Sequence, residues 1–276
     1  MKIAIVGLGL MGGSLAISLK KLDFISTVVG SDHNKIHQQE AMTLGLVDKI
    51  VEFEDVKNYD VIFLAIPVDG IIAALENLRD IKKSTTIIDL GSTKTKIIDS
   101  VPQSIRENFV AAHPMTGTEN FGPTAAVENL YTDKAVVICD LEHSGEAQAD
   151  IAKKIFSALE MKKYFMSAKS HDRHAAFISH MPHAISYSLA NTVMNQENKH
   201  NILALAAGGF RSMSRLAKSS ANMWEDIFRQ NRENLLEAIT LFENELSILK
   251  EHIKNEEWEE VHKNIEAGNR LHDILD

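Results

Sequence analysis

Ile3-Ala4-Ile5-Val6-Gly7-Leu8-Gly9-Leu10-Met11-Gly12 is the stretch of the sequence that decides the fold. Its first four residues predict a short buried strand, and residues 14–21 after the glycines predict a helix. A strand, a G-x-G-x-x-G turn and a helix form, in this order, a site for a dinucleotide. Gly7 permits the tight turn, Gly9 lets the backbone approach a pyrophosphate, and Gly12 lets the helix pack closely on the strand.

The residues that follow supply the second half of such a site. Thr27-Val28-Val29-Gly30-Ser31 predicts a second strand, and Asp32 comes directly after it. A carboxylate at this point can bind the hydroxyls of the adenosine ribose. It would repel a 2′-phosphate, and His33-Asn34 supplies no arginine to receive one. We therefore predict NAD rather than NADP as the cofactor.

Strands and helices alternate up to about residue 112. Val61-Ile62-Phe63-Leu64-Ala65-Ile66-Pro67 is a continuous apolar run, typical of a parallel strand that is covered on both faces. Residues 68–78 predict a helix, and residues 85–90 and 109–112 predict two more strands. The alternation indicates an α/β domain with a Rossmann-type, doubly wound parallel sheet. Besides the glycines and Asp32, the predicted cofactor site includes Leu10, Met11, Ala65 and Pro67.

The pattern of apolar residues changes beyond Ser167. Residues 134–140 and 163–166 predict the last strands, around a helix over 145–159, and later residues carry only helical spacing, over 203–207, 213–217 and 227–249. We therefore predict an NAD-binding domain over 1–166 and an all-α domain for substrate binding and dimerisation over 167–276, with a cleft between them. One apolar stripe at steps of three and four is longer than such a small domain buries alone, which predicts a homodimer. The stripe consists of Leu235, Ile239, Phe242, Leu246 and Leu249.

Composition excludes several classes of function. The chain has 276 residues, a net charge of −9 and no basic cluster, which argues against nucleic acid as a partner. No apolar run approaches the roughly 20 residues that a membrane span needs. The apolar N-terminus is not interpreted as a signal peptide, because cleavage would delete the first strand. The one cysteine, Cys139, cannot form an internal disulfide and fits a reducing cytoplasm.

A second stretch, Ala111-Ala112-His113-Pro114-Met115, places a histidine at the exit of a predicted strand. Ligands bind at such strand ends in open α/β sheets, and imidazole suits proton transfer near neutral pH. The alternative for His113 is a residue that only caps a turn. Ser92 follows another predicted strand, where its hydroxyl either caps the next helix or faces the site.

The predicted helical domain has polar groups of its own. His180 and His183 lie three positions apart, so both face one side if their segment is helical. We predict no metal there, because no third and fourth ligand is evident and Pro182 would disturb a ligand helix. Arg215 is suited to binding a carboxylate, with a solvated surface position as the alternative. Trp224 is either a core residue or part of the site.

These motifs, taken in their order along nearly the whole chain, resemble those of the prephenate dehydrogenase family of tyrosine biosynthesis, which includes arogenate dehydrogenases. Two residues depart from the family's pattern. Thr116 stands where the family usually has alanine, and Ser212 stands where some members have an acid, which bears on how Arg215 is held. The matching segments are Gly7-x-Gly9-x-x-Gly12-Gly13-Ser14, Gly91-Ser92-x-Lys94, His113-Pro114-Met115-x-Gly117-Thr118-Glu119, His171-Asp172, Ser179-His180-x-Pro182-His183, Gly208-Gly209-Phe210 and Met223-Trp224.

The resemblance implies NAD-dependent oxidative decarboxylation of prephenate to 4-hydroxyphenylpyruvate. Hydride leaves the ring carbon, the hydroxyl becomes a carbonyl, and the ring carboxylate departs as CO₂. In the implied site His113 accepts the hydroxyl proton, and Ser92 orients His113 or the hydroxyl. Arg215 holds a substrate carboxylate. The remaining implied substrate residues are His180, His183 and Trp224, which line the pocket, with Glu119 and Lys94 behind them.

Three alternatives remain at this level. Arogenate carries an ammonium where prephenate has a keto group, and we prefer prephenate because no added acid plainly awaits an ammonium. A β-hydroxyacid dehydrogenase shares the architecture but relies on a lysine in its helical domain rather than on a histidine after a strand. A non-catalytic NAD sensor needs neither His113 nor Arg215. We also expect no chorismate mutase module or regulatory module, so that any inhibition by tyrosine acts at the active site.

Overall fold

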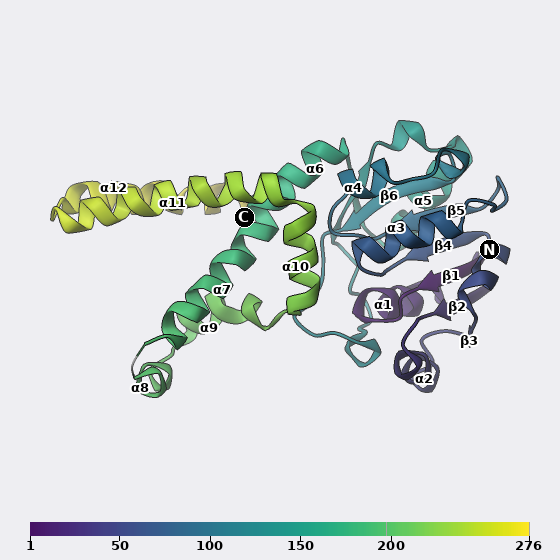
Figure 1. The fold of residues 1–276 in the computed structure, drawn as a ribbon, viewed down its shortest axis with the longest axis horizontal. Coiled ribbons are helices and arrows are strands. Elements are labelled where there is room, and N and C mark those ends of the chain that lie inside the picture. The colour runs from purple at the N-terminus through teal and green to yellow at the C-terminus, as the bar shows by residue number, and fades with distance from the viewer. Residues whose placement is uncertain (197, 276) are drawn as a thin grey trace. The chain divides into compact units, whose positions relative to one another are not determined.

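The computed structural model describes residues 1–196 and 198–275, and the chain forms two compact units, Met1–Asn231 and Arg232–Asp276. The first unit contains an eight-stranded sheet, and its strands and flanking helices can be followed in Figure 1. The strands are β1 (Lys2–Val6), β2 (Thr27–Ser31), β3 (Lys49–Ile50), β4 (Val61–Leu64), β5 (Thr86–Asp89), β6 (Phe109–Pro114), β7 (Ala135–Cys139) and β8 (Lys162–Met166).

The strand order confirms the predicted doubly wound sheet. It runs β3-β2-β1-β4-β5-β6-β7-β8, so the chain starts in the middle, winds to one edge and returns to wind to the other. The order reverses between β1 and β4, the point at which open α/β sheets bind their ligands. Each neighbouring pair is parallel except β6 and β7.

The antiparallel pairing of β7 with β6 is a departure that the strand–helix alternation did not predict. His113 lies opposite Val137 and Pro114 opposite Val136. A parallel neighbour needs a crossover, usually a helix, but the connection over residues 115–134 carries only the 3₁₀ turn Pro123–Ala125. The chain therefore enters β7 at the end where β6 finishes.

Helices cover both faces of the sheet, as its buried strands require. Alternate residues of β1 point to opposite sides: Ile3 and Ile5 join a core formed with α1, α2 and α5, whereas Ala4 and Val6 join a core formed with α3 and α4. The bounds of these helices are α1 (Leu10–Leu19), α2 (Lys35–Thr43), α3 (Val68–Asn77), α4 (Thr95–Asp99) and α5 (Glu146–Ala158).

Two elements of this region were not predicted. Helix α2 buries one residue, Ala41, so its sequence carries no apolar stripe. Strand β3 is two residues long and sits at the sheet edge. Helix α1 also starts earlier than predicted, directly after Gly9, because Gly12 and Gly13 are part of its first turn. Glycine lowers helix propensity, which hides this start from the sequence pattern.

The rest of the first unit is helical, as predicted. The predicted helix over 203–207 is wrong in its bounds, because α8 ends at Ala204. The predicted helix over 213–217 is instead the end of α9 followed by the 3₁₀ turn Arg215–Lys218. The elements are α6 (Ala168–Ala175), a π-helical turn (Ala176–His180), α7 (Met181–Met194), α8 (Lys199–Ala204), α9 (Gly208–Ser214) and α10 (Ala221–Gln230).

The helical spacing over 227–249 belongs to two helices rather than one. Helix α10 ends at Gln230, and Asn231 stands outside it with backbone angles of φ −113° and ψ 33°. Asn231 is 3% exposed, and its side chain hydrogen-bonds to Asp172 and His180. Amide side chains compete with helical hydrogen bonds. The side chain of Asn231 bonds to residues distant in the sequence, and the helix ends before it.

The second unit consists of α11 (Arg232–Lys254), α12 (Trp258–Asn269) and α13 (His272–Leu275), of which α11 and α12 pack against each other. Of the predicted stripe, Leu235 is buried and Leu246 is 53% exposed. Within residues 1–196 and 198–275, no helix is both long enough and apolar enough to cross a membrane. Other large apolar side chains exposed on α11 and α12 are Leu236, Leu241, Ile248, Ile253, Trp258 and Ile265.

Cys139 ends strand β7 and is buried, as predicted. Burial raises the pKa of its thiol to about 12. The thiolate is the reactive form of cysteine, so this side chain is chemically inert in the folded protein.

Candidate functional site

The carboxyl ends of β1, β4, β5 and β6 meet at one edge of the sheet, because these strands are parallel. The glycine turn follows β1, Ala65 follows β4, Ser92 lies in the loop after β5, and His113 lies near the end of β6. The topology therefore brings the two predicted parts of the site, for dinucleotide and for proton transfer, to the same edge.

The glycine turn has the geometry that its spacing predicts. Gly7 has a φ of +93°, which favours glycine, and a Cβ there would overlap the Ala65 carbonyl. A Cβ on Gly12 would overlap the carbonyl oxygen of Gly7, whereas one on Gly9 would meet no heavy atom within 4 Å. The open side of Gly9 is thus the place where a pyrophosphate can approach the backbone.

The start of α1 offers backbone donors to such a group. Gly13 makes the first backbone hydrogen bond of the helix, to Gly9 at 2.8 Å. The N–H groups of Leu10, Met11 and Gly12 precede it, and N–H groups in the first turn have no partner within a helix. Together with the positive end of the helix dipole they suit an anion.

Asp32 is held rigidly beside this turn. Its carboxylate is 5% exposed and accepts hydrogen bonds from the backbone N–H groups of Leu8 and Asn34, each at 2.8 Å. A carboxylate has about four acceptor positions, so it can still receive ribose hydroxyls. The rings of His33 and His37 lie nearby, each with Nδ1 3.5 Å from an oxygen of this carboxylate.

Lys94 and Asp89 form a buried ion pair beneath the site, with both side chains fully buried. The Lys94 ammonium also donates to the Ala112 carbonyl at 2.8 Å, and the Asp89 carboxylate accepts from the backbone N–H groups of Gly91 and Ala112. Lys94 thus ties β5 to β6 just before His113. Because the Lys94 side chain has no exposed surface, it cannot touch a substrate in this arrangement. Its predicted position behind the pocket is therefore compatible only with a role in supporting the residues that do.

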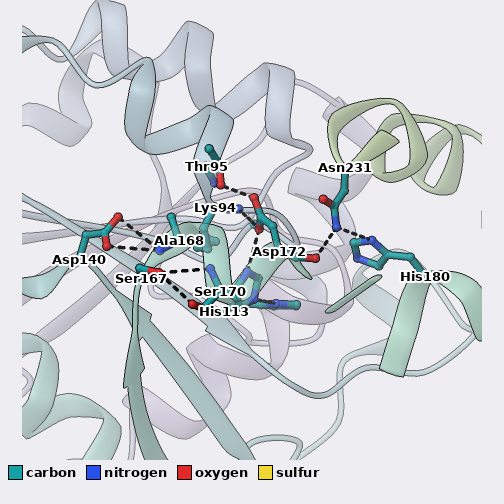
Figure 2. Close-up of polar contacts among 12 residues, drawn as sticks. Lys94, Thr95, His113, Asp140, Ser167, Ala168, Ser170, Asp172, His180 and Asn231 are labelled. Carbon is teal, nitrogen blue, oxygen red and sulfur yellow. Dashed lines mark hydrogen bonds and ion pairs between the residues drawn. The ribbon is translucent and has the colours of Figure 1, made fainter. Parts of the chain in front are cut away.

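His113 is the end of a line of hydrogen bonds that Figure 2 shows. Its Nδ1 lies 2.8 Å from Nε2 of His171, and Nδ1 of His171 lies 2.8 Å from Oδ1 of Asp172. Asp172 in turn accepts the backbone N–H groups of Lys94 at 2.8 Å and Thr95 at 2.9 Å. The line crosses from β6 through α6 to the start of α4.

The pKa values along this line follow from burial and hydrogen bonding. Burial is the main reason that the pKa of His113 lies well below its usual 6.5. Burial acts to raise the pKa of Asp172, but hydrogen bonds from His171 and Thr95 outweigh it, so this pKa is lowered. At neutral pH His113 is therefore an uncharged base and Asp172 a carboxylate.

His180 and Asn231 extend the network on the other side of Asp172. The Asn231 amide donates to the Asp172 carbonyl at 2.6 Å, and it lies 3.1 Å from Nδ1 of His180. Burial lowers the pKa of His180 to about 4, so its ring is neutral. An amide N–H at Nδ1 places the ring proton on Nε2, which has no hydrogen-bond partner among the described residues.

His183 and Trp224 lie next to this unpaired group. Their rings stack with centroids 3.5 Å apart, and His180 meets the indole edge-on at 6.0 Å. The predicted shared side of His180 and His183 is therefore confirmed. The indole N–H of Trp224 is buried and likewise has no partner in the part of the chain that the structure describes. Two unpaired N–H donors thus lie together on one apolar wall.

A π-helical turn explains how distant histidines share a face. A π turn rotates the chain by about 80° per residue, compared with about 100° in an α-helix, so five π-helical residues rotate it by about 100° less than five α-helical ones. The turn Ala176–His180 therefore shifts the faces of the following helix by about one residue position. His171 and Asp172 before it and His183 after it then lie within about a quarter turn of one another. Pro182, which has no N–H to donate, comes directly after the π turn, where the helical hydrogen-bond pattern returns from π to α.

Arg215 and Glu119 form an ion pair at 3.2 Å, with the Arg215 side chain 52% exposed. Arg215 begins a 3₁₀ turn, and Glu119 comes from the loop after β6. The carboxylate partner shows that the guanidinium can reach an anion at this position. Ser212 is exposed, and Thr116 hydrogen-bonds to the Leu130 carbonyl within the loop.

Ser92 departs from one of its predicted roles. Across residues 1–196 and 198–275, no hydrogen bond joins Ser92 to His113, and His171 holds the ring instead. Contact between Ser92 and a substrate hydroxyl stays a prediction. The sequence named the His171-Asp172 motif without a role, and nothing in it indicated Asn231. Within those residues no group of three or more His, Cys, Asp or Glu could hold a metal ion.

Comparisons with known proteins place these features in context. The family model described as "Prephenate dehydrogenase, nucleotide-binding domain" matches residues 15–164, and "Prephenate dehydrogenase, dimerization domain" matches residues 167–267. A prephenate dehydrogenase of Bacillus subtilis is 29% identical over 99% of this chain and 76% of its own length.

Solved structures give the same picture. A prephenate dehydrogenase of A. aeolicus, in complex with hydroxyphenyl propionate and NAD+, has a TM-score of 0.92 at 30% identity, covering 100% of this chain and 98% of its own. An arogenate dehydrogenase of Synechocystis has a TM-score of 0.82 at 27% identity, covering 100% of both chains.

Proposed function

Because the chain belongs to the prephenate dehydrogenase family, we propose that it catalyses the NAD-dependent oxidative decarboxylation of prephenate to 4-hydroxyphenylpyruvate. The observation that carries the proposal is His113, a neutral imidazole anchored through Nδ1 at the same sheet edge as the glycine turn. Membership of this family of dehydrogenases removes the alternatives of a β-hydroxyacid dehydrogenase and of a non-catalytic sensor.

The residues of the first unit fit NAD. The open side of Gly9 and the N–H groups that start α1 suit the pyrophosphate, and Asp32 suits a ribose diol and disfavours a 2′-phosphate. Ala65, which follows β4, lies against Gly7 of the glycine turn, and Pro67 precedes the first residue of α3. NAD held by these residues would supply the acceptor for the hydride that leaves the ring carbon. The A. aeolicus relative was solved with NAD+, which supports the assignment.

The chain's own residues supply the proton transfer. His113 accepts the proton of the 4-hydroxyl at Nε2 as the hydride leaves, and the O–H electron pair becomes part of the carbonyl. The ring carboxylate, on the carbon para to the hydroxyl, then departs as CO₂, and the electron pair of its C–C bond enters the ring, which becomes aromatic. Ser92, in the loop after β5, is the proposed second contact to the hydroxyl.

Donors on the helical side suit the two carboxylates of prephenate. Arg215 binds one carboxylate by exchanging its partner Glu119 for the substrate. The unpaired N–H groups of His180 and Trp224 offer hydrogen bonds to the other carboxylate, and the His183 ring stacks on the Trp224 indole. We prefer prephenate to arogenate because the unpaired groups of His180 and Trp224 are N–H donors, which suit the oxygen acceptors of prephenate and offer no acceptor to an ammonium.

NADH production by the purified protein tests the proposal, with prephenate and arogenate each offered alongside NAD and NADP. We expect the highest kcat/KM for prephenate with NAD. A higher kcat/KM for arogenate would identify arogenate, rather than prephenate, as the substrate. Absence of NADH with both substrates, in a protein that binds NAD, would overturn the proposal.

A variant at Arg215 tests the substrate contact. Arg215→Ala should raise KM for prephenate by about 10- to 100-fold with little change in kcat, because a carboxylate contact is shared by ground and transition states. Arg211→Ala is the matched control: Arg211 is an exposed arginine of the adjoining helix and donates to the Ala206 carbonyl. An equal change of KM in the two variants would show that Arg215 does not contact the substrate.

We further propose that the chain functions as a homodimer through residues 167–276, the predicted second domain. The matching family model is described as a dimerization domain. Apolar side chains such as Leu246 and Trp258 are more than half exposed in the second unit, and a partner surface would bury them.

A further inference from the structure

We propose that His171 and Asp172 are positioning residues that hold His113 in one tautomer, with its basic nitrogen at Nε2, and that stabilise the imidazolium formed when His113 takes a proton. The inference rests on the proposed function for its kinetic consequences. Its structural content, the tautomer of His113, can be measured without any substrate.

The direction of each hydrogen bond follows from Asp172. Its Oδ1 accepts the Lys94 N–H and its Oδ2 accepts the Thr95 N–H, so this side chain acts as an acceptor on both oxygens. Toward His171 Nδ1, at 2.8 Å, a carboxylate can again only accept. The proton of a neutral His171 therefore sits on Nδ1, and its Nε2 presents a lone pair.

The same reasoning fixes His113. A lone pair at His171 Nε2, 2.8 Å away, requires a donor, so Nδ1 of His113 carries the proton. Nε2 of His113 is then the unprotonated, basic nitrogen, on the opposite side of the ring from His171. The two rings lie with their planes at 72° to each other, an arrangement that accommodates a ring N–H pointing at a ring nitrogen.

Burial makes this arrangement decisive. His171 is 2% exposed and Asp172 is 4% exposed, so water does not compete for their hydrogen bonds. Hydrogen bonds and charges act strongly in such an environment. The other titratable groups near His113 do not offer a rival acceptor: Lys94 is paired with Asp89, and His180 is engaged by Asn231.

The role becomes chemical when His113 accepts a proton. The substrate O–H bond breaks, the proton forms a new bond to Nε2, and the O–H electron pair enters the C–O bond while hydride leaves the carbon. His113 then carries a positive charge next to Lys94, which disfavours it. The Asp172 carboxylate, acting through His171, supplies the compensating negative charge. Neither residue touches the reacting atoms.

The tautomer is tested first, in the wild-type protein. Histidine rings labelled with ¹⁵N show by NMR which ring nitrogen carries the proton, and His113→Asn assigns the signals. We expect the Nδ1–H form for His113 at neutral pH. The Nε2–H form would overturn the proposal, whatever the enzyme's activity, so this result is independent of the proposed substrate.

Asp172→Asn tests the source of the tautomer. An amide N–H facing His171 would reverse both bonds and leave the proton on Nε2 of His113, where no base remains. We expect kcat with prephenate to fall by roughly 10²- to 10⁴-fold with nearly unchanged KM and NAD affinity, and the His113 signal to move toward the Nε2–H form. Unchanged tautomer and kcat in a folded variant would refute the role.

Asp140→Asn is the matched control. Asp140 accepts the backbone N–H of Ala168 at the start of the same helix, α6, and makes no contact with His113 (Figure 2). We expect it to keep wild-type kcat and the Nδ1–H form. If Asp172→Asn does not fold, the wild-type tautomer alone decides. A wild-type protein with the Nδ1–H form but no activity would reject the proposed function and leave the hydrogen-bond assignment standing.

Discussion

At the scale of single residues, the site depends on groups whose neighbours fix their protonation. His113 and His180 are both neutral at physiological pH because burial lowers their pKa values, while Asp172 stays ionised because its oxygens are hydrogen-bonded. The sequence identified His113 and Asp32 because each follows a strand. It could not assign His171 to His113, because that pairing joins β6 to α6 and exists only in the folded chain.

The pH dependence of catalysis follows from the His113 pKa. The base acts only when neutral, so kcat/KM should fall as pH decreases through the lowered pKa and stay flat above about pH 6.5. A profile of kcat/KM between about pH 5 and 9 measures this. His113→Asn should lower kcat by roughly 10²- to 10⁴-fold with little change in substrate binding. An acid limb centred at or above pH 6.5, or near-normal kcat in the variant, would show that His113 is only a loop residue.

The cofactor preference should depend on Asp32. Asp32→Ala removes a charged acceptor for the ribose, so KM for NAD should rise by about 10- to 100-fold and the ratio of NAD to NADP efficiency should narrow. Asp32 also accepts hydrogen bonds from backbone N–H groups, so Asp48→Ala serves as the control. Asp48 likewise accepts a backbone N–H, that of Val28 at 2.8 Å, but does not contact the glycine turn. A wild-type preference for NADP would contradict the assignment.

At the scale of elements, the site is built where regular structure is interrupted. The glycine turn starts α1, the π turn Ala176–His180 aligns the histidines, and Asn231 ends α10 with its side chain inside the network. The first interruption was predictable because glycines mark it. The other two were not, since a π turn has no residue signature and Asn231 acts through tertiary partners.

A pair of glycine variants separates binding from folding at α1. Gly12→Ala would place a Cβ on the Gly7 carbonyl, so it should lower Tm by about 5 °C or more. Gly9→Ala meets no heavy atom within 4 Å and has an ordinary φ of −69°, so Tm should hold. KM for NAD should nevertheless rise at least about tenfold, because the methyl group occupies the approach of the pyrophosphate. Thermal unfolding and NAD titration measure the two effects. A lowered Tm in Gly9→Ala would contradict the assignment of Gly9 to cofactor binding alone.

At the scale of the whole molecule, the alternation of strands and helices predicted the sheet, and the loss of strand signals predicted the helical region. The antiparallel β7 was not predictable, because strand patterns carry no direction and only the helix-free connection over 115–134 sets it. The apolar stripe that predicted a dimer combines a buried Leu235 with an exposed Leu246, a contrast that sequence spacing alone does not reveal.

The proposed dimer can be tested at Leu246. Leu246→Glu should weaken the dimer by at least about 10²-fold in Kd, because burying a leucine contributes about 1.5–3 kcal/mol and a two-fold interface contains the residue twice. Ser247→Glu adds the same charge at an exposed neighbouring position and should leave the dimer intact. Sedimentation over a range of concentrations measures both, and a wild-type protein that remains monomeric throughout would refute the dimer.

The inert thiol of Cys139 gives the protein a silent background for chemical labelling. A thiol reagent added to the native protein should find no reactive group, because the one cysteine is buried and its thiol is protonated. A cysteine introduced at an exposed position such as Ser247 would then carry a single spin label or fluorophore per chain. No native residue would have to be removed first, so distances between copies of the chain could be recorded on an otherwise unaltered enzyme.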